Sequence, residues 1–221
     1  MAAVRAVLFD LDGTLLDTCE DWVAAFNASL ALVGASPLPL DAVVRWIGTP
    51  FETILARAVA LPEALIPRVT AEFNRREAEW IRHGVRTFPG VPEMIAGLGR
   101  WRLAAVSNKR TDTAREVLQI AGLAERFDAV VGGDAVSRKK PAPDPVLKAA
   151  ELLEVPAGAC VLVGDTENDV LAGKAAGART VGVTWGYGGR ARLEAAGVDH
   201  LIEAPGALAP LLRALTPSTA T

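Results

Sequence analysis

The fold of this 221-residue chain is decided by its residues 4–14, Val4-Arg5-Ala6-Val7-Leu8-Phe9-Asp10-Leu11-Asp12-Gly13-Thr14. An apolar run fills the first half of this segment and ends abruptly at acidic residues and a glycine, which is typical of a strand buried on both faces of a sheet. Four further runs of this kind lie at residues 103–106, 129–131, 160–163 and 180–183. The sequence therefore predicts five buried strands.

Helical patterns lie between the later strands. The sequence predicts helices at residues 111–121, 145–154, 167–176, 190–196 and 207–215, followed by a frayed tail at residues 216–221. An alternation of strand and helix at this spacing gives right-handed crossovers and a parallel sheet covered on both faces. We therefore expect an α/β fold built on a parallel sheet.

A stretch without a convincing strand interrupts this alternation after the first strand. It carries helical periodicity, broken by prolines and a glycine, with helices expected at residues 21–32, 40–46, 51–60 and 68–82. We therefore predict two domains. An α/β core comprises residues 1–17 and 88–221, and an all-helical domain, residues 18–87, is inserted into it.

The composition excludes several classes of function. Its 23 Lys and Arg nearly balance 26 Asp and Glu, and the longest basic run is Arg138-Lys139-Lys140, so we expect neither nucleic acid nor a membrane surface as a partner. The apolar start is cut short by Asp10 and Asp12, well before the roughly 20 residues that a membrane span needs. The distant Cys19 and Cys160 fit a reducing cytoplasm and give no zinc site.

Polar residues follow the predicted strands at the points where the strands end. Asp10 and Asp12 follow the first strand, Ser107-Asn108-Lys109 follows the second, and the acidic segment 165–169 follows the fourth. In an open α/β sheet, the ligand site forms beyond the carboxyl ends of the strands. We therefore expect these side chains to meet at one edge of the sheet.

The acidic residues at this edge need cations. Four carboxylates, those of Asp10, Asp12, Asp165 and Asp169, would repel one another there. The cost is about 4 kcal/mol for each pair at ~4 Å and an effective dielectric constant of roughly 20. A hard divalent ion such as Mg²⁺ and the ammonium of Lys140 are the candidates. A phosphate dianion would leave the site negative, so we expect one carboxyl to be protonated and to act as a general acid.

The string Asp10-Leu11-Asp12-Gly13-Thr14-Leu15-Leu16-Asp17-Thr18 resembles the first signature of the haloacid dehalogenase (HAD) superfamily of phosphotransferases. The blocks at Ser107, Lys140 and Asp165 resemble its other three signatures, in the same order, so the resemblance covers nearly the whole chain. It implies a Rossmann-like HAD core. The helical insertion then resembles a cap that closes over small substrates and excludes water.

The resemblance also implies a role for each matching residue. Asp10 would be the nucleophile that forms an aspartyl-phosphate, and Asp12 the acid that protonates the leaving oxygen and then the base that activates water. The other implied roles are phosphoryl binding by Ser107 and the Asn108 amide, charge neutralisation by Lys140, and a Mg²⁺ shell of Asp10, the Asp12 carbonyl and Asp165, with Asp169 supporting the metal waters or Lys140. These roles fit phosphoryl transfer, which asks a protein for positioning and electrostatic stabilisation.

Within the superfamily, the nearest resemblance is to bacterial phosphoglycolate phosphatases. The matching segments are Arg45-Trp46-Ile47-Gly48, Lys140-Pro141-Ala142-Pro143, Gly164-Asp165-Thr166 and Val183-Thr184-Trp185-Gly186-Tyr187-Gly188. The resemblance implies cytoplasmic hydrolysis of a small phosphorylated metabolite, 2-phosphoglycolate, to glycolate and phosphate by a monomer or a homodimer. Many of these enzymes have Gly-x-Gly where this chain has Gly48-Thr49-Pro50, so a pyrophosphatase, a sugar phosphatase and a nucleotidase stay as alternatives.

Residue types at Asp12 and within the insertion narrow the activity further. The candidate substrate loop of the cap comprises Trp46, Gly48 and Thr49. An intact Asp12 favours C–O–P hydrolysis over dehalogenation. Trp22 and Phe51 stand where related sugar-phosphate mutases carry histidine and arginine, which disfavours a mutase.

Two other classes of protein share part of this pattern. A phospho-accepting receiver domain also gathers acidic residues, Ser or Thr, and Lys at strand ends, but it uses neither Asp12 as an acid nor a helical insertion. The intact acidic residues and Lys140 disfavour a binding module without catalysis. Plainer interpretations also exist for single residues: Ser107 as a helix cap, Asp169 as a surface charge in a first helical turn, and Lys139 as a solvated side chain.

Overall fold

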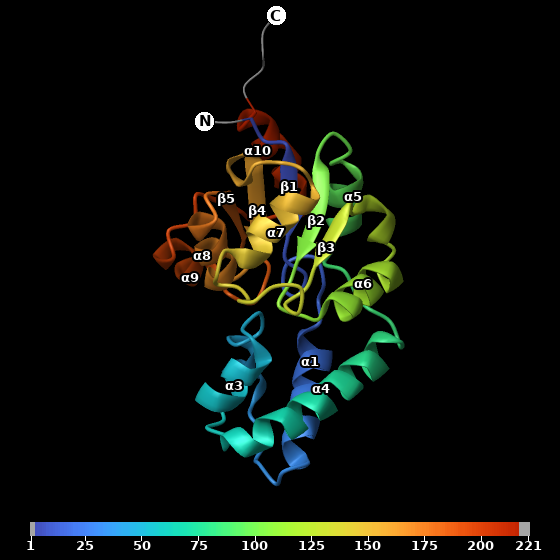
Figure 1. Cartoon of the computed structure of the whole chain (residues 1–221). Helices are drawn as coiled ribbons and strands as arrows, with labels where there is room; N and C mark the ends of the chain where they lie inside the picture. The colour runs from blue at the N-terminus through green and yellow to red at the C-terminus, as the bar shows by residue number, and fades with distance from the viewer. Residues whose placement is uncertain (1–2, 217–221) are drawn as a thin grey trace, which may run out of the picture.

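The computed structural model describes residues 3–216, and this part of the chain contains a sheet of six parallel strands (Figure 1). The strands are β1 Ala6–Phe9, β2 Arg102–Val106, β3 Ala129–Val131, β4 Cys160–Gly164, β5 Arg179–Val183 and β6 His200–Ile202. Across the sheet they lie in the order β3-β2-β1-β4-β5-β6. The first strand therefore lies inside the sheet, where it pairs with both β2 and β4.

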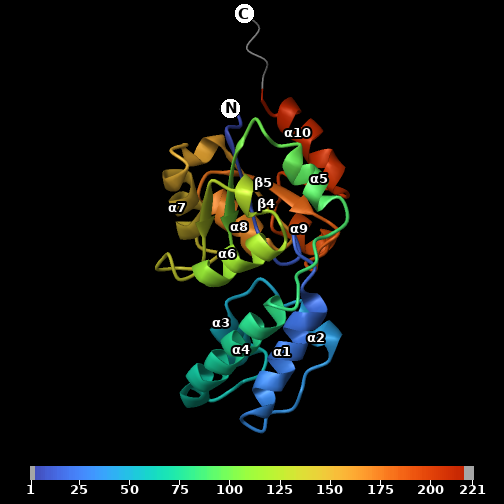
Figure 2. The same cartoon turned by 90° about the vertical axis from the view of Figure 1, so that its right-hand side faces the viewer.

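Helices cover both faces of this sheet. They are α5 Val91–Ala96, α6 Thr111–Ile120, α7 Asp144–Leu152, α8 Glu167–Ala175, α9 Arg190–Ala195 and α10 Leu208–Ala214. Short 3₁₀ helices lie at η2 Ala124–Arg126, η3 Ala157–Ala159 and η4 Pro205–Ala207. Figure 2 shows α7 on one side of the sheet and α5 and α10 on the other. The predicted α/β class with a parallel sheet is confirmed.

The alternation of side chains along β1 explains why both faces are covered. Val7 and Phe9 belong to a hydrophobic cluster with residues of α5, α6 and α10, whereas Ala6 and Leu8 belong to a cluster with residues of α7 and α8. All four side chains are fully buried. Because burial of each large apolar side chain contributes about 1.5–3 kcal/mol, a strand that is apolar on every residue is stable only between two layers of helices.

One strand and one α-helix of this core are absent from the sequence prediction. β6 has only three residues at the edge of the sheet, and two of them are partly exposed, so it presents no apolar run. α5 has six residues and a proline in its first turn, which leaves too few residues to show helical periodicity. The predicted tail lies, from residue 217 on, outside the described residues.

Residues 19–81 form a helical unit that contains no strand. Its helices are α1 Cys19–Ala31, α2 Leu40–Val44, α3 Phe51–Arg57, η1 Glu63–Leu65 and α4 Ile66–Ile81. The unit has a hydrophobic cluster of its own, in which the rings of Phe51 and Phe73 stack with centroids 4.2 Å apart. α4 begins before the predicted residue 68 because Pro67 occupies its first turn, where a missing N–H breaks no helical hydrogen bond.

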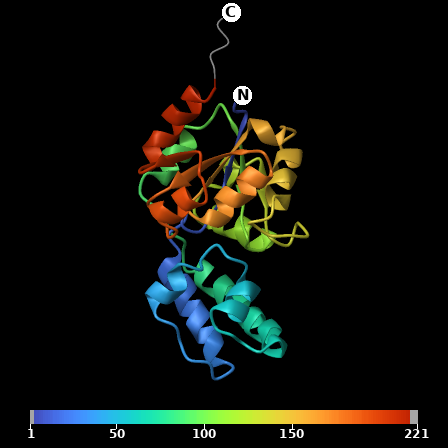
Figure 3. The same ribbon diagram turned by 90° about the vertical axis from the view of Figure 1, so that its left-hand side faces the viewer.

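The chain enters and leaves the helical unit at one place. The N–H of Asp17 donates to the carbonyl oxygen of Arg86, at 2.9 Å, and the N–H of Phe88 donates to that of Leu15, at 3.1 Å. The two connecting segments therefore lie side by side. Figures 1 and 3 show the helical unit at one end of the molecule, with α10 at the far end of the core. Among residues 3–216, none of the helices combines the length and the apolar character that crossing a membrane would require.

The separate cluster of the helical unit makes a stability prediction. Leu30 of α1 is fully buried, whereas Leu32, just after the same helix, is 42% exposed. We expect Leu30→Ala to lower the free energy of unfolding by about 2–5 kcal/mol, because it leaves a cavity, and Leu32→Ala to change it by less than about 0.5 kcal/mol. Urea unfolding measures both values. Equal losses in the two variants would contradict the assigned packing.

Candidate active site

The carboxyl ends of the central strands bring the predicted acidic residues together. Asp10 follows β1, Ser107 follows β2 and Asp165 follows β4, and these three strands are neighbours in the sheet. Asp169 lies on α8, one turn beyond Asp165. Carboxylate oxygens of Asp10, Asp165 and Asp169 lie within 4.8 Å of one another, and all three residues are buried. We call these three residues the acidic cluster.

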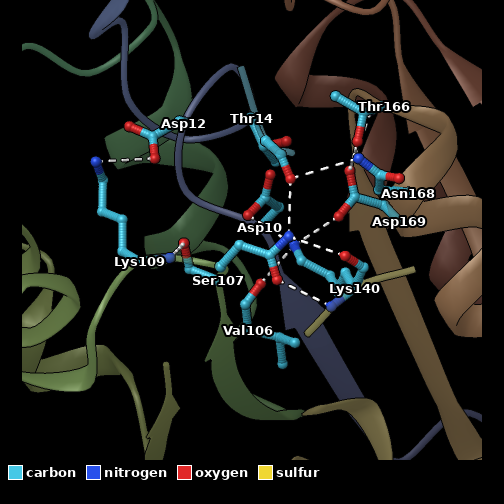
Figure 4. Close-up of polar contacts among 12 residues, drawn as sticks. Asp10, Asp12, Thr14, Val106, Ser107, Lys109, Lys140, Thr166, Asn168 and Asp169 are labelled. Carbon is cyan, nitrogen blue, oxygen red and sulfur yellow. Dashed lines mark hydrogen bonds and ion pairs between the residues drawn. The ribbon is translucent and has the colours of Figure 1, made fainter. Parts of the chain in front are cut away.

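Lys140 supplies the positive charge of this cluster. Its Nζ lies 2.8 Å from Asp10 Oδ1 and 2.6 Å from Asp169 Oδ1, and it donates to the carbonyl oxygen of Val106, at 2.8 Å (Figure 4). Only 1% of the Lys140 side chain is exposed. Since an ammonium has three protons, these contacts use all of its donors. Burial alone would lower the pKa of Lys140, but the Asp10 and Asp169 carboxylates hold it above its ordinary value.

Hydrogen bonds from nearby turns fix one oxygen of Asp165 and one oxygen of Asp169. The Oδ2 atom of Asp165 accepts the N–H of Tyr187, at 2.7 Å, and that of Gly188, at 3.3 Å. The Oδ2 atom of Asp169 accepts the N–H and the hydroxyl of Thr166, at 3.1 and 2.7 Å, which closes a capping box at the start of α8. The loop after β5 therefore fixes Asp165, and the helix start fixes Asp169.

Burial and like charge raise the pKa values of the cluster. Burial is the largest cause for Asp10, whose pKa rises from 3.8 to about 7 although Lys140 acts to lower it. Burial, followed by the charges of Asp10 and Asp169, also raises the pKa of Asp165 well above its ordinary value. Ionising the whole cluster is therefore costly without a further cation.

The acidic cluster fits a divalent cation of the hard, oxygen-binding kind. If fully ionised, its three carboxylates and the ammonium of Lys140 leave two net negative charges in a buried place. The buried Oδ2 atom of Asp10 has no hydrogen-bond partner. An unpartnered carboxylate oxygen among others of its kind suits Mg²⁺, which takes oxygen ligands.

Asp12 points away from the acidic cluster. Its Oδ1 atom accepts the hydroxyl of Thr18, at 2.6 Å, and its Oδ2 atom lies 3.1 Å from the Nζ of Lys109. Figure 4 shows Asp12 turned toward Lys109, with Lys140 and Asp169 on the other side of Asp10. The structure therefore brings Asp10, Asp165 and Asp169 together by their carboxylates but leaves the Asp12 carboxylate out of the group.

The remaining predicted residues of the core lie beside Asp10. Ser107 is buried, and its Oγ accepts the N–H of Lys109, at 3.2 Å. The side chain of Asn108 donates to the carbonyl oxygens of Gly48 and Lys140, at 2.9 and 3.0 Å, and accepts the N–H of Lys140, at 2.9 Å. Asn108 therefore links the loop of the helical unit to the backbone of Lys140.

A pocket of about 340 Å³ lies between the acidic edge and the helical unit, and Asp10, Asp12, Ser107 and Asn108 all line it. Gly48 and Thr49 of the predicted substrate loop line it as well. Trp46 is not among the lining residues and packs against the hydrophobic cluster of the helical unit. Lys139, expected to be solvated, lines the pocket and lies 3.4 Å from the carboxylate of Glu52.

Comparison with known proteins identifies the family. Residues 7–183 match the family described as haloacid dehalogenase-like hydrolase. The chain belongs to this hydrolase family. A protein of Cupriavidus necator named phosphoglycolate phosphatase, plasmid, is 39% identical over 94% of this chain and 92% of its own length. A phosphoglycolate phosphatase of Nitrosospira multiformis is 37% identical, over 83% and 85%. The family that the four motifs indicate is confirmed.

Two solved structures share the fold of the chain. A protein of Haemophilus somnus, described as a predicted phosphoglycolate phosphatase, superposes with a TM-score of 0.86 and 26% identity, covering 96% of this chain and 99% of that one. A hydrolase from Pseudomonas syringae superposes with a TM-score of 0.83 and 27% identity, covering 96% of this chain and the whole of that one.

The structure of this HAD hydrolase shows contacts of Lys109, Glu77 and Tyr187 that the sequence pattern does not predict. The side chain of Lys109 is buried. It contacts Asp12 of the core and Glu77, which lies on α4. The hydroxyl of Tyr187 accepts the N–H groups of Thr18 and Cys19, at 2.8 and 3.0 Å, so the loop after β5 also reaches the entry to the helical unit. The sequence could have indicated Glu77 as a carboxylate within an apolar helical stripe, because a buried carboxylate requires a buried partner.

The raised pKa of Asp10 makes a pH prediction for the metal-free HAD hydrolase. The folded pKa of about 7 lies above the ordinary 3.8, so between these values the folded protein keeps a proton that the unfolded chain has released. Rising pH therefore favours unfolding across this window, by at most about 1.4 kcal/mol per pH unit for one such group. Asp10→Asn lacks this contribution.

Urea unfolding of the wild type and Asp10→Asn in a chelator, between pH 4 and pH 8, measures the effect. The stability of the wild type relative to Asp10→Asn is expected to decline as the pH rises through the window. A difference that stays constant with pH would show that burial does not raise the Asp10 pKa.

Proposed function

We propose that this HAD hydrolase is a Mg²⁺-dependent phosphomonoesterase that acts on small organic phosphates through an aspartyl-phosphate on Asp10, with 2-phosphoglycolate as its substrate. The observation that carries the proposal is the contrast between Asp10 and Asp12. Both line one pocket, yet Asp10 contacts Lys140 within the acidic cluster, whereas Asp12 contacts Thr18 and Lys109. Two carboxylates in different surroundings suit two different tasks in one reaction.

Asp10 performs the first task as the nucleophile. A carboxylate oxygen of Asp10 forms a bond to phosphorus while the bond from phosphorus to the leaving oxygen breaks, which gives an aspartyl-phosphate and an alcohol. Lys140 lies 2.8 Å from Asp10 and supplies positive charge where the phosphoryl oxygens gather negative charge. The buried hydroxyl of Ser107 and the backbone amide of Asn108 bind those oxygens.

Asp12 performs the second task as acid and base. It gives its proton to the leaving oxygen in the first step, so the alcohol departs neutral. In the second step it accepts a proton from the water that attacks phosphorus, which releases phosphate and restores both carboxyl groups. The contacts from Thr18 and Lys109 hold the Asp12 carboxyl apart from the acidic cluster, on the side of the pocket that faces the helical unit.

The acidic cluster would hold the metal ion, with Asp10 and Asp165 as ligands together with the Asp12 carbonyl, and with Asp169 in support. A bound Mg²⁺ supplies charge neutralisation for the phosphoryl group and for the carboxylates that face it. The raised pKa values of Asp10 and Asp165 support this, because such a cluster binds a cation in exchange for protons.

Substrate size and location follow from the pocket and the composition. A pocket of about 340 Å³, closed on one side by the loop with Gly48 and Thr49, is at the small end of ligand sites, which suits a small metabolite. We propose residues 18–87 as a cap that closes over it. We propose that the protein acts as a monomer or a homodimer. The unpaired cysteines Cys19 and Cys160 suit the cytoplasm.

The specificity for 2-phosphoglycolate rests on the names of the relatives. Because Gly48-Thr49-Pro50 departs from the Gly-x-Gly of many such enzymes, the competing substrates are pyrophosphate, sugar phosphates and nucleoside monophosphates. The test is kcat/KM for each of these phosphate compounds with purified protein and Mg²⁺. We expect 2-phosphoglycolate to exceed the others by at least about tenfold. If 2-phosphoglycolate shows no advantage over these compounds, the proposed substrate is wrong and the proposed phosphatase class stays.

Asp10→Asn tests the nucleophile. We expect turnover of every phosphate ester to fall by on the order of 10³-fold or more, because an amide cannot form the phosphorylated intermediate. Asp112→Asn, an exposed acidic residue of α6, is the matched control and should keep wild-type activity. Phosphate release measures both. Wild-type turnover by Asp10→Asn would rule out the mechanism, and retention of one phosphate without turnover by the wild type would indicate a receiver-like domain.

Asp165→Asn tests the metal site without an activity assay. Mg²⁺ at about 100 times its Kd should raise the Tm of the wild type by roughly 5 °C, because ligand binding stabilises only the folded state. The variant should lose most of this increase, whereas Asp112→Asn should keep it. Differential scanning calorimetry measures the three proteins. An equal increase in all three would place the ion elsewhere.

A further inference from the structure

A second group of buried charges lies beside the acidic cluster and joins the core to the helical unit. The Nζ atom of Lys109 lies 2.5 Å from Oε1 of Glu77 and 3.1 Å from Oδ2 of Asp12. The side chains of Lys109, Glu77 and Asp12 are only 5%, 6% and 9% exposed. Lys109 follows β2 in the core, whereas Glu77 belongs to α4. We call this arrangement the Asp12–Lys109–Glu77 bridge.

Glu77 depends on Lys109 for its place in the fold. The buried residues of α4 are Val69, Phe73, Glu77 and Ile81, a stripe with one residue in every turn. A carboxylate in such a stripe costs several kcal/mol unless a cation pairs with it. Burial raises the pKa of Glu77, and Lys109 opposes this rise. Within the apolar stripe of α4, the carboxylate of Glu77 therefore lies at the position that contacts Lys109.

The helical unit also fixes the position of the Lys109 ammonium. Besides Glu77, α4 contributes Trp80, whose ring centroid lies 5.8 Å from Nζ, within reach of a cation–π contact. The ammonium thus has two contacts from α4 and one from the core carboxylate of Asp12. If α4 moved away, Lys109 would lose Glu77 and Trp80 together and would enter water.

The orientation of Asp12 depends in turn on Lys109. One oxygen of the Asp12 carboxyl accepts the hydroxyl of Thr18, at the entry to the helical unit, and the other faces Lys109. Without the ammonium in place, only Thr18 would hold the carboxyl. The acid–base group would then be free to turn toward Lys140 and the acidic cluster.

We propose that Glu77 is a positioning residue for Asp12, which acts through Lys109 and makes the acid–base carboxyl depend on the helical unit. This proposal rests on the proposed function, in which Asp12 gives its proton to the leaving oxygen as the bond from phosphorus to that oxygen breaks. The bridge holds the proton donor over the pocket, while Asp10 and the acidic cluster stay as they are.

The leaving group provides the test. Phenyl phosphate and p-nitrophenyl phosphate have nearly the same shape, but phenolate needs a proton in order to leave far more than p-nitrophenolate does. Since kcat/KM covers the steps up to release of the phenol, it reports proton donation and not the later attack of water. We expect Glu77→Gln to lower kcat/KM for phenyl phosphate by at least about tenfold and that for p-nitrophenyl phosphate by less than about threefold.

Glu79→Gln is the matched control. Glu79 lies on the same helix, is 56% exposed and pairs only with the exposed Arg75 among the described residues. Both esters should stay within about twofold of the wild type. If Glu77→Gln lowers kcat/KM equally for the two esters, the bridge only holds the helical unit against the core and does not position Asp12. If Glu77→Gln lowers neither value, the proposal is wrong. A wild type that hydrolyses no phosphate ester, 2-phosphoglycolate included, would remove the proposed function as well.

A second variant removes the risk that Glu77 or Lys109, left without the other, unfolds the protein. Glu77→Leu combined with Lys109→Met deletes this pair together, which is often neutral for stability, and leaves Asp12 with the hydroxyl of Thr18. We expect this double variant to melt within a few degrees of the wild type and to show the same selective loss on phenyl phosphate. Wild-type kcat/KM on both esters would overturn the proposal.

Discussion

The contact of Lys140 with Asp10 and Asp169 is the interaction on which the rest of the site depends. The ammonium is almost wholly buried and contacts the end of β1, the start of α8 and the carbonyl oxygen of Val106 at the end of β2. A buried carboxylate without a partner is strongly disfavoured, so this single cation allows the end of β1 and the start of α8 to present acidic groups at one place. The contact therefore decides where chemistry is possible in the fold.

Lys140 alone does not neutralise the acidic cluster. The negative charge that remains is what suits the site to a further cation. Lys140 offsets one of three buried carboxylates, and the pKa values of Asp10 and Asp165 stay raised. A site with buried, unneutralised charge of this kind is suited to a cation, and it lowers the stability of the fold when no cation is bound. Selection for stability alone would have replaced the acidic cluster with apolar side chains.

Much of this arrangement is predictable from the sequence, because parallel strands align their carboxyl ends by rule. That rule brings Asp10, Ser107 and Asp165 together once the apolar runs are identified as strands. The bridge through Glu77 is not predictable in this way, since its partners come from a helix of the insertion and a loop of the core, and no local pattern states how α4 sits on the sheet. Trp46 shows the same limit, because its neighbouring residues Gly48 and Thr49 line the pocket and it does not.

The paired connecting segments have a consequence for how such proteins diversify. Since Leu15 to Asp17 and Arg86 to Phe88 lie side by side, the insertion begins and ends at nearly the same point in space. An insertion with adjacent ends can be exchanged for another of different length without moving any strand of the sheet. Sequence changes in the helical unit can therefore alter its side of the pocket while the strand ends that carry the acidic cluster keep their places.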